Sequence, residues 1–461
     1  MNLKRILIVF FYSVLLIAMG IISGLQSNVL ANDSVCLSEQ NNNGLSDVFD
    51  LLIVAPSEFN DALHPLVDHK NNVGIQSRIV NIDQINMPGC RDKQEEIKWY
   101  IKASIEEHDI SYVLLVGDRE KIPVRYSYSA KVGGLKPFIS DLYYADIYDE
   151  YGEFCSWDSN DNDKFGELSK DEMIDELDLY PDVYLGRLLC SNVSEVTIVV
   201  DKIIDYETNT FGKEWFHDIL LCGGDTHPGI ILTLLNMKGY EGELLCEEVK
   251  KIMDDFNPIL LYTSAILPSF LKPTADDATF LTFDQINTAI NQGAGFVLFS
   301  GHGSVDGWNT HSPILKNIFL YLTTYRSELI KSLENENKLP IIVMDACSCG
   351  DFSNNSGTSS PIAWDFVKKP GGGAIATIAC TTLSLDIVGK SFTDFLSGYF
   401  TTQLFLATSS GYAGEMLGQA QTTYLNSFSD YDHQDCLIVE EFTLFGDPSL
   451  KIGGYNWEEI L

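Results

Sequence analysis

The feature that most constrains the fold is a series of short apolar runs, each of which ends in polar residues or glycine. Five of them read FDLLIVAP, SYVLLVGD, HDILLCGGD, GFVLFSGHG and PIIVMDAC, at residues 49–56, 111–118, 217–225, 295–303 and 340–347. Continuous apolar runs of about four to eight residues are typical of strands that are buried on both faces of a sheet. Helix-like segments lie between or after them, at about 58–73, 93–107, 194–208, 283–292 and 361–368. This alternation predicts an α/β fold with mostly parallel sheets flanked by helices.

The length of the chain allows more than one α/β unit. It has 461 residues, of which 45% are hydrophobic, enough for a sizeable core. The rhythm of strands and helices occurs in two successive α/β halves that meet near residue 210, and no repeat of fixed period is present. We therefore predict a linker at 32–49, an N-terminal α/β subdomain at 50–210 and a second subdomain, which carries the chemistry, at 211–455.

The first residues have the order of a secretory signal. Lys4 and Arg5 precede an apolar stretch from Ile6 to Ile22, and Val29 and Ala31 stand at the small-residue positions of a cleavage site. We predict a signal peptide at 1–31 and export from the cell, as a secreted or cell-surface protein. Because the apolar stretch is somewhat long, an uncleaved membrane anchor is the alternative.

The charge balance limits the partners. The chain has 65 acidic and 30 basic residues, a formal net charge of −35. Such a field repels nucleic acid and anionic membranes and attracts cations or basic ligands. We therefore expect no nucleic-acid partner, and contact with a membrane only through an uncleaved signal.

Chemically active side chains follow several of the predicted strands. Asp118, Asp225, His302 and Cys347 all stand at carboxyl ends, where ligands collect in open parallel sheets. His302 lies between two glycines, which let the backbone turn sharply and approach a ligand. These positions predict one site at one edge of the sheet.

The pair most suited to catalysis is Cys347 and His302. Cys347 follows His302 by 45 residues, at the end of the next predicted strand of the pattern. A thiol beside an imidazole loses its proton more readily, and the thiolate is the attacking species. The backbone N–H groups of Gly303 and Cys347 are the predicted oxyanion hole. Cys349 is the rival nucleophile, and a disulfide or metal clip formed by both thiols is the other alternative.

Several motifs resemble the gingipain family of secreted cysteine peptidases, which belongs to the caspase-like group of folds. The likeness lies in FSGHGSVDGW, LPIIVMDACSCGDF, GGGAIATIACTT and FTLFGDPSL, and in the earlier stretches ISYVLLVGDREKIP, SDLYYADI and DVYLGRLLC. It covers roughly residues 50–452, nearly all of the chain after the predicted signal.

The resemblance implies roles for individual residues. It makes Cys347 the nucleophile of a thioester mechanism and His302 the general acid and base. It implies that Asp225, in LLCGGDTHPG, orients the histidine. It also implies an acid at the base of the pocket for a basic P1 side chain, and Glu243, in YEGELLCEEV, matches that region best. The alternative for Glu243 is an ordinary exposed helix residue, and Asp118 is interpreted as a structural turn aspartate.

An oxygen-rich loop is a candidate calcium site. In WDSNDNDKFGE, residues 157–167, the candidate ligands are Asp158, Asn160, Asn162 and Glu167. Oxygen ligands at alternate positions followed by an acid resemble part of an EF-hand loop, although the glycine is displaced. Calcium here would stiffen the loop, and we predict no cofactor for catalysis. The alternative is a polar surface turn.

These observations predict a cysteine endopeptidase that acts on protein or peptide substrates. Two other functions use the same residues differently. A surface-protein transpeptidase would form the same thioester and resolve it with an amine. A non-catalytic, calcium-dependent surface-binding protein would keep the scaffold without the chemistry, which the presence of both His302 and Cys347 argues against.

Overall fold

A large α/β sheet organises the protein. The computed structural model describes residues 48–129, 137–169, 172–224, 240–272, 274, 277–311, 321–353, 360–384, 396–428 and 433–460. Within these residues an 11-stranded sheet has the order β11-β10-β9-β12-β16-β17-β18-β8-β3-β1-β2. Its strands are β1 (Leu51–Ala55), β2 (Ser77–Asn81), β3 (Tyr112–Val116), β8 (Tyr184–Leu188), β9 (Asp218–Gly223), β10 (Asn257–Tyr262), β11 (Thr279–Phe280), β12 (Phe296–Ser300), β16 (Ile341–Asp345), β17 (Ala376–Cys380) and β18 (Phe442–Phe445). The predicted α/β class with a mostly parallel sheet is confirmed.

The central strands are buried along their whole length. Every residue of β1, β3, β12, β16 and β17 is buried. Their uninterrupted apolar sequences suit this position, because helices cover both faces of such a sheet. One hydrophobic cluster runs through the strands of both halves of the chain.

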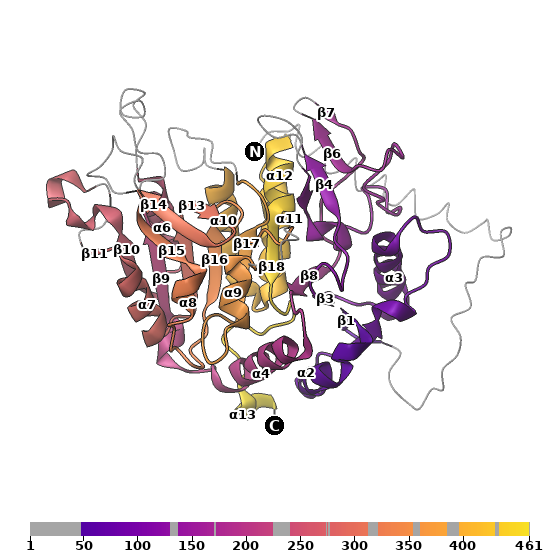
Figure 1. Ribbon diagram of the computed structural model, residues 1–461, viewed down its shortest axis with the longest axis horizontal. Helices are drawn as coiled ribbons and strands as arrows, with labels where there is room; N and C mark the ends of the chain where they lie inside the picture. The colour runs from indigo at the N-terminus through magenta and orange to yellow at the C-terminus, as the bar shows by residue number, and fades with distance from the viewer. Residues whose placement is uncertain are drawn as a thin grey trace, which may run out of the picture. The chain divides into compact units, whose positions relative to one another are not determined.

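Helices flank the sheet (Figure 1). One group of helices in mutual contact consists of α6, α10, α11 and α12, and another consists of α2, α4, α9, α8 and α7. The helices are α2 (Asn60–Asn72), α3 (Lys93–His108), α4 (Val193–Asn209), α6 (Glu241–Ile252), α7 (Phe283–Gln292), α8 (Ser327–Ile330), α9 (Ile362–Lys368), α10 (Leu396–Leu406), α11 (Ala413–Asn426), α12 (His433–Glu441) and α13 (Trp457–Ile460). Short 3₁₀ helices are η1 (Ser57–Phe59), η2 (Ile82–Gln84), η3 (Asp141–Tyr144), η4 (Glu214–His217), η5 (Thr263–Ile266), η6 (Ser269–Leu271) and η9 (Ala407–Ser410).

Strand β18 reverses the direction of the sheet. It pairs antiparallel with β17 and parallel with β8. The strands of the first half of the chain therefore run opposite to those of the second half. Consequently the carboxyl end of β3, which precedes Asp118, lies at the other edge from the carboxyl ends of β12 and β16. The predicted convergence of Asp118 with His302 and Cys347 is wrong for this reason.

Two small sheets accompany the main one. One has the order β13-β14-β15, formed by His302–Ser304, Gly307–His311 and Tyr321–Arg326. The other has the order β5-β4-β6-β7, formed by Phe138–Ile139, Tyr126–Ser129, Phe165–Ser169 and Glu172–Met173. The first of these sheets carries the predicted histidine, and the second contains the end of the predicted calcium loop.

The predicted domain boundaries remain predictions. Residues 47–461 form one compact unit, in which the sheet continues across residue 210 through β18 and β8. The predicted signal peptide at 1–31 and most of the linker at 32–49 lie outside the described residues. Among the described residues, no helix combines the length and apolar character needed to cross a membrane.

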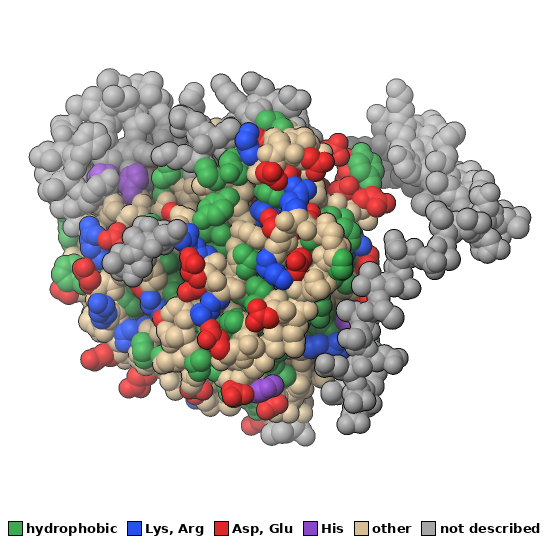
Figure 2. Space-filling view, turned by 45° about the vertical axis from the view of Figure 1, so that its right-hand side comes forward, with side chains coloured by type: hydrophobic (Ala, Val, Ile, Leu, Met, Phe, Trp, Pro, Cys, Tyr) green, Lys and Arg blue, Asp and Glu red, His purple; other side chains and the backbone are tan. Residues whose placement is uncertain are grey.

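Charges of both signs mix on the visible surface. Figure 2 shows acidic side chains scattered among basic ones on the face in view, with no large basic patch there. The chain as a whole carries a formal net charge of −35.

Candidate active site

His302 and Cys347 follow two neighbouring parallel strands. β12 and β16 pair in register, with Ser300 opposite Asp345. His302 lies two residues after Ser300, and Cys347 lies two residues after Asp345. Both residues therefore stand at the same edge of the sheet. The Gly301 N–H donates to the Asp345 carbonyl at 3.2 Å and extends the pairing one step beyond β12.

The Cys347 side chain is half-buried in a tight turn. Its thiol donates to the Ser384 carbonyl across 3.6 Å. The next residue, Ser348, has a φ of 56° in the left-handed region, and its N–H donates to the Thr382 carbonyl at 2.7 Å. A non-glycine residue in this conformation is uncommon and marks a backbone that its surroundings hold in place.

The His302 side chain is half-buried and belongs to a β-hairpin. β13 and β14 pair antiparallel, with His302 opposite Asn309 and Gly303 opposite Trp308. The ring of His302 meets the ring of buried His311 edge-on, with centroids 5.4 Å apart and planes at 85°. Sequence reasoning missed His311; the pattern HGSVDGWNTH, which forms a hairpin around Val305 and Asp306, is the signal that indicates it.

Gly303 joins the hairpin to the cysteine turn. A β-carbon on Gly303 would overlap with the Cys347 carbonyl oxygen and would lie 2.7 Å from the Cys349 sulfur. The histidine hairpin and the cysteine turn are therefore in backbone contact. Glycine is required at residue 303 by this close approach and not by its backbone angles.

Cys349 points into the protein. It is a fully buried free thiol, so the two cysteines form no disulfide clip. Burial raises the pKa of the Cys349 thiol well above its ordinary value, and the neighbouring Cys347 adds to this. Such a thiol is a poor nucleophile at neutral pH.

The predicted orienting acid, Asp225, lies outside the described residues, which end directly before it at Gly224. A β-carbon on Gly224 would overlap with the Thr310 hydroxyl of β14 and would lie 2.9 Å from Thr263 Cγ2. Gly224, the residue directly before Asp225, therefore lies beside the hairpin that carries His302.

Glu243 is completely buried near the start of α6, so the alternative of an exposed helix residue is wrong. Its carboxylate accepts hydrogen bonds from Thr263 Oγ1 at 3.1 Å, Ser264 N–H at 2.8 Å, Ser264 Oγ at 2.5 Å and Thr274 Oγ1 at 3.0 Å. Burial raises the pKa of Glu243, although these hydrogen bonds oppose the shift. The carboxylate therefore ties the segment after β10 to α6.

Asp118 has the turn role interpreted from the sequence. Its Oδ1 accepts the N–H groups of Glu120 at 3.1 Å and Lys121 at 3.2 Å. This arrangement caps the turn that follows β3.

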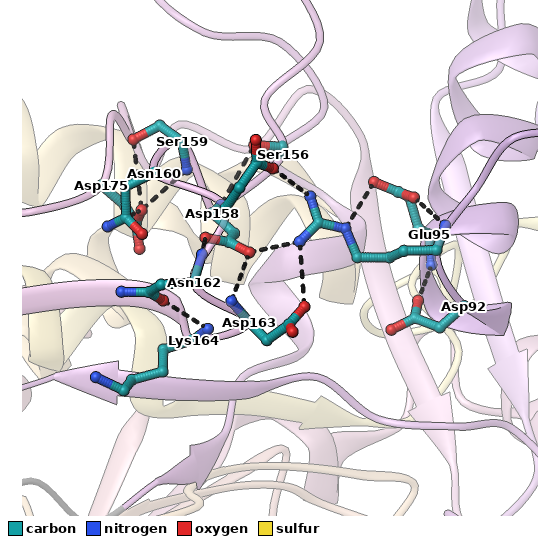
Figure 3. Close-up of polar contacts among 12 residues, drawn as sticks. Asp92, Glu95, Ser156, Asp158, Ser159, Asn160, Asn162, Asp163, Lys164 and Asp175 are labelled. Carbon is teal, nitrogen blue, oxygen red and sulfur yellow. Dashed lines mark hydrogen bonds and ion pairs between the residues drawn. The ribbon is translucent and has the colours of Figure 1, made fainter.

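The predicted calcium loop is closed by hydrogen bonds. Asp158 is buried and accepts the backbone N–H groups of Asn162 at 2.9 Å and Asp163 at 3.0 Å, as Figure 3 shows. The Asn162 side-chain amide donates to Glu167 at 2.5 Å, and Asn160 donates to the same oxygen at 3.4 Å. All four predicted ligands therefore belong to one polar cluster.

A cation from the protein itself contacts this loop. The Arg91 guanidinium forms an ion pair with Asp158, and it also approaches Asp161 at 3.5 Å. In the part of the chain that the structure describes, no three His, Cys, Asp or Glu side chains gather closely enough to hold a metal ion. Carboxylate and amide oxygens are donors that suit calcium. Arg91 already pairs with one of them, Asp158, so calcium binding stays a prediction.

Comparison with known proteins decides the family. The model of peptidase family C25 matches residues 45–453. The chain belongs to peptidase family C25. Membership in a peptidase family indicates protein or peptide substrates, and the predicted resemblance to gingipains is confirmed.

Individual relatives are distant. The chain is 23% identical over 422 residues to gingipain R2 of Porphyromonas gingivalis strain W83, an alignment that covers 87% of this chain and 46% of the relative. Gingipain R1 of Porphyromonas gingivalis is also 23% identical, with 87% of this chain and 34% of the relative covered. The chain thus spans less than half the length of either relative.

Solved structures share the fold. The crystal structure of the Arg-specific cysteine proteinase gingipain R (RgpB) is similar with a TM-score of 0.62 and 20% identity, and the match covers 88% of this chain and 79% of that one. A structure described only as a protease is similar with a TM-score of 0.59 and 16% identity, over 88% of this chain and 78% of that one. The predicted caspase-like fold of the gingipains is therefore confirmed.

Proposed function

We propose that this C25 family member is a secreted cysteine endopeptidase with Cys347 as nucleophile and His302 as general acid and base. The observation that carries the proposal is the contact between the two turns at one sheet edge. His302 and Cys347 follow paired positions of β12 and β16, and Gly303 lies against the Cys347 carbonyl.

The reaction proceeds through a thioester. The Cys347 thiolate, whose proton is on His302, attacks the scissile carbonyl carbon, and the negative charge moves to the carbonyl oxygen. The amide N–H groups of Gly303 and Cys347 stabilise this oxyanion. As the C–N bond breaks, the His302 imidazolium gives its proton to the leaving amine. His302 then removes a proton from water, which hydrolyses the thioester and regenerates the thiol.

Asp225 is proposed to orient the His302 ring. Support comes from Gly224, which packs beside Thr310 of the same hairpin. An acid at this position stabilises the imidazolium that forms during the reaction.

A basic P1 residue is the proposed specificity. Support comes from Glu243, a buried acid on α6 whose neighbour Gly242 lies against the Ser300 carbonyl at the end of β12, and from the Arg-specific relative among the solved structures. The four hydrogen bonds to Glu243 must rearrange or be shared when a guanidinium or ammonium group arrives.

Export and calcium complete the proposal. The signal-like first 31 residues carry the chain out of the cell, where millimolar calcium stiffens the loop around Asp158. The catalytic steps need no metal or other cofactor.

A thiol-trapping probe with a basic peptidyl group tests the function. The probe should label wild-type protein on Cys347 and abolish its peptide hydrolysis. The variants Cys347→Ala and His302→Ala should show neither probe labelling nor peptide hydrolysis. Equal labelling of wild type and Cys347→Ala would refute the proposal. Addition of an amine acceptor separates the transpeptidase, because only a transpeptidase diverts most of the product to the amine.

A further inference from the structure

We propose that Cys349 is a positioning residue that fixes the histidine hairpin against the cysteine turn. The inference rests on the proposed function, because it assigns to the second thiol the task of keeping His302 in reach of Cys347. Neither the family match nor the motifs of the sequence give Cys349 a positioning role.

The thiol contacts the hairpin at both of its strands. Its sulfur donates to the Gly307 carbonyl of β14 across 3.8 Å. On β13, the sulfur lies 2.7 Å from the place that a β-carbon of Gly303 would take. One buried atom therefore meets the strand before the turn and the strand after it.

The backbone around Cys349 is itself held firmly. The Ser348 and Gly350 N–H groups donate to the Thr382 and Cys380 carbonyls at 2.7 and 2.8 Å. The Cys349 carbonyl accepts the Ala363 N–H at 3.1 Å. The sulfur is therefore mounted on a fixed backbone, between residues 380–382 and the start of α9.

The hairpin depends on the same neighbours. The Ile362 N–H donates to the Val305 carbonyl at 2.7 Å, directly beside the bond from Ala363 to Cys349. The start of α9 thus contacts both the hairpin turn and the cysteine turn. The buried Cys349 thiol adds a direct contact between these two turns through Gly307.

The chemistry gives this contact its importance. Proton transfer requires the imidazole within hydrogen-bond reach of the thiol, and a displacement of about 1 Å costs about a hundredfold in rate. Burial keeps Cys349 protonated, so that it remains a hydrogen-bond donor to Gly307 over the working pH range.

Three substitutions test the proposal. Cys349→Ala removes the thiol, Cys349→Val fills most of its volume without a donor, and Cys349→Ser restores a donor. Cys190→Ala, at another fully buried free cysteine that follows β8, is the matched control for the loss of a sulfur. The measurements are kcat/KM on a peptide substrate, Tm, and the pH profile of Cys347 alkylation by iodoacetamide, read by peptide mass spectrometry.

The expected result separates positioning from stability. Cys349→Ala and Cys349→Val should lower kcat/KM about tenfold to a hundredfold and move the alkylation midpoint of Cys347 upward by about one pH unit, because the thiolate loses its aligned imidazolium. Cys349→Ser should recover most of the wild-type kcat/KM and most of the wild-type alkylation midpoint. Cys190→Ala should change only Tm.

Two results have different meanings. If Cys349→Val keeps the wild-type kcat/KM and alkylation profile, the positioning role is overturned while the proposed peptidase stands. If Cys347→Ala remains active and Cys349→Ala is inactive, Cys349 is the nucleophile, and both the positioning role and the proposed dyad are overturned.

Discussion

Gly303 has no room for a side chain, because a β-carbon there would overlap with the carbonyl oxygen of Cys347. Sheet pairing brings β12 and β16 side by side. The contact of Gly303 with Cys347 then brings the histidine hairpin after β12 against the cysteine turn after β16. It is a direct backbone contact between the histidine hairpin and the cysteine turn, so substitutions there should affect catalysis before they affect the fold.

Gly303→Ala should lower kcat/KM by about a hundredfold, because the added methyl must push the Cys347 carbonyl away and so move the nucleophile. Gly414→Ala on α11 is the control for crowding at a glycine outside the two turns, since its β-carbon would lie 2.7 Å from Pro448 Cβ and the substitution should lower Tm alone. The measurement is peptide hydrolysis together with labelling of Cys347. Equal activity in the two variants would contradict the role of this contact.

Glu243→Gln should reduce the preference for P1 arginine or lysine over a neutral P1 residue by about tenfold or more, because the charge that recognises the basic group is lost. The measurement is kcat/KM for matched fluorogenic peptides. Thr274→Val is the control, since it removes one hydroxyl from the carboxylate and keeps the charge. A uniform loss for all P1 residues in Glu243→Gln would assign Glu243 to support of the segment after β10 and not to specificity.

The calcium loop should respond to chelation. Removal of calcium should lower Tm by a few degrees, because Asp158, Asn162 and Glu167 then lack the cation that draws their oxygens together. Arg91 competes for Asp158, so Arg91→Gln should enlarge the calcium-dependent shift. Differential scanning calorimetry with calcium and with chelator measures both effects. Identical melting with and without calcium in wild type and Arg91→Gln would contradict a calcium site.

The sequence predicts the central strands β1, β3, β12 and β16 well, because each is a short, continuous apolar run bounded by polar residues or glycine, as is typical of a strand buried on both faces. It does not predict the direction of β18, a four-residue strand whose orientation depends on partners at residues 184–188 and 376–380. That one reversal explains why Asp118 was placed at the wrong edge.

The candidate site divides in the same way. Cys347 and His302 are visible in sequence because their strands and glycines are local features. The burial of Glu243 and the contacts of Cys349 depend on segments that are 20 or more residues away along the chain, so no local pattern encodes them. The ring contact of His311 with His302 lies within one hairpin, and the pattern HGSVDGWNTH does indicate it.

Glu440→Gln should stabilise the protein at alkaline pH. Burial raises the pKa of Glu440 to about 8, Asp146 adds to the shift, and the Ser127 hydroxyl opposes it. The folded protein therefore holds a proton that the unfolded chain releases above a pKa of 4.5. Because the unfolded state then binds fewer protons, this group makes the free energy of unfolding fall as pH rises from about 4.5 to about 8.

Glutamine cannot titrate, so the variant should lose this part of the pH dependence. At pH 8 its free energy of unfolding should exceed that of wild type by roughly 1–4 kcal/mol, and at pH 4 the two should agree more closely. Urea unfolding at several pH values measures the difference. Glu328→Gln, at an exposed position on α8, is the control and should follow wild type at every pH. A Glu440→Gln curve parallel to that of wild type would show that Glu440 does not titrate in this range.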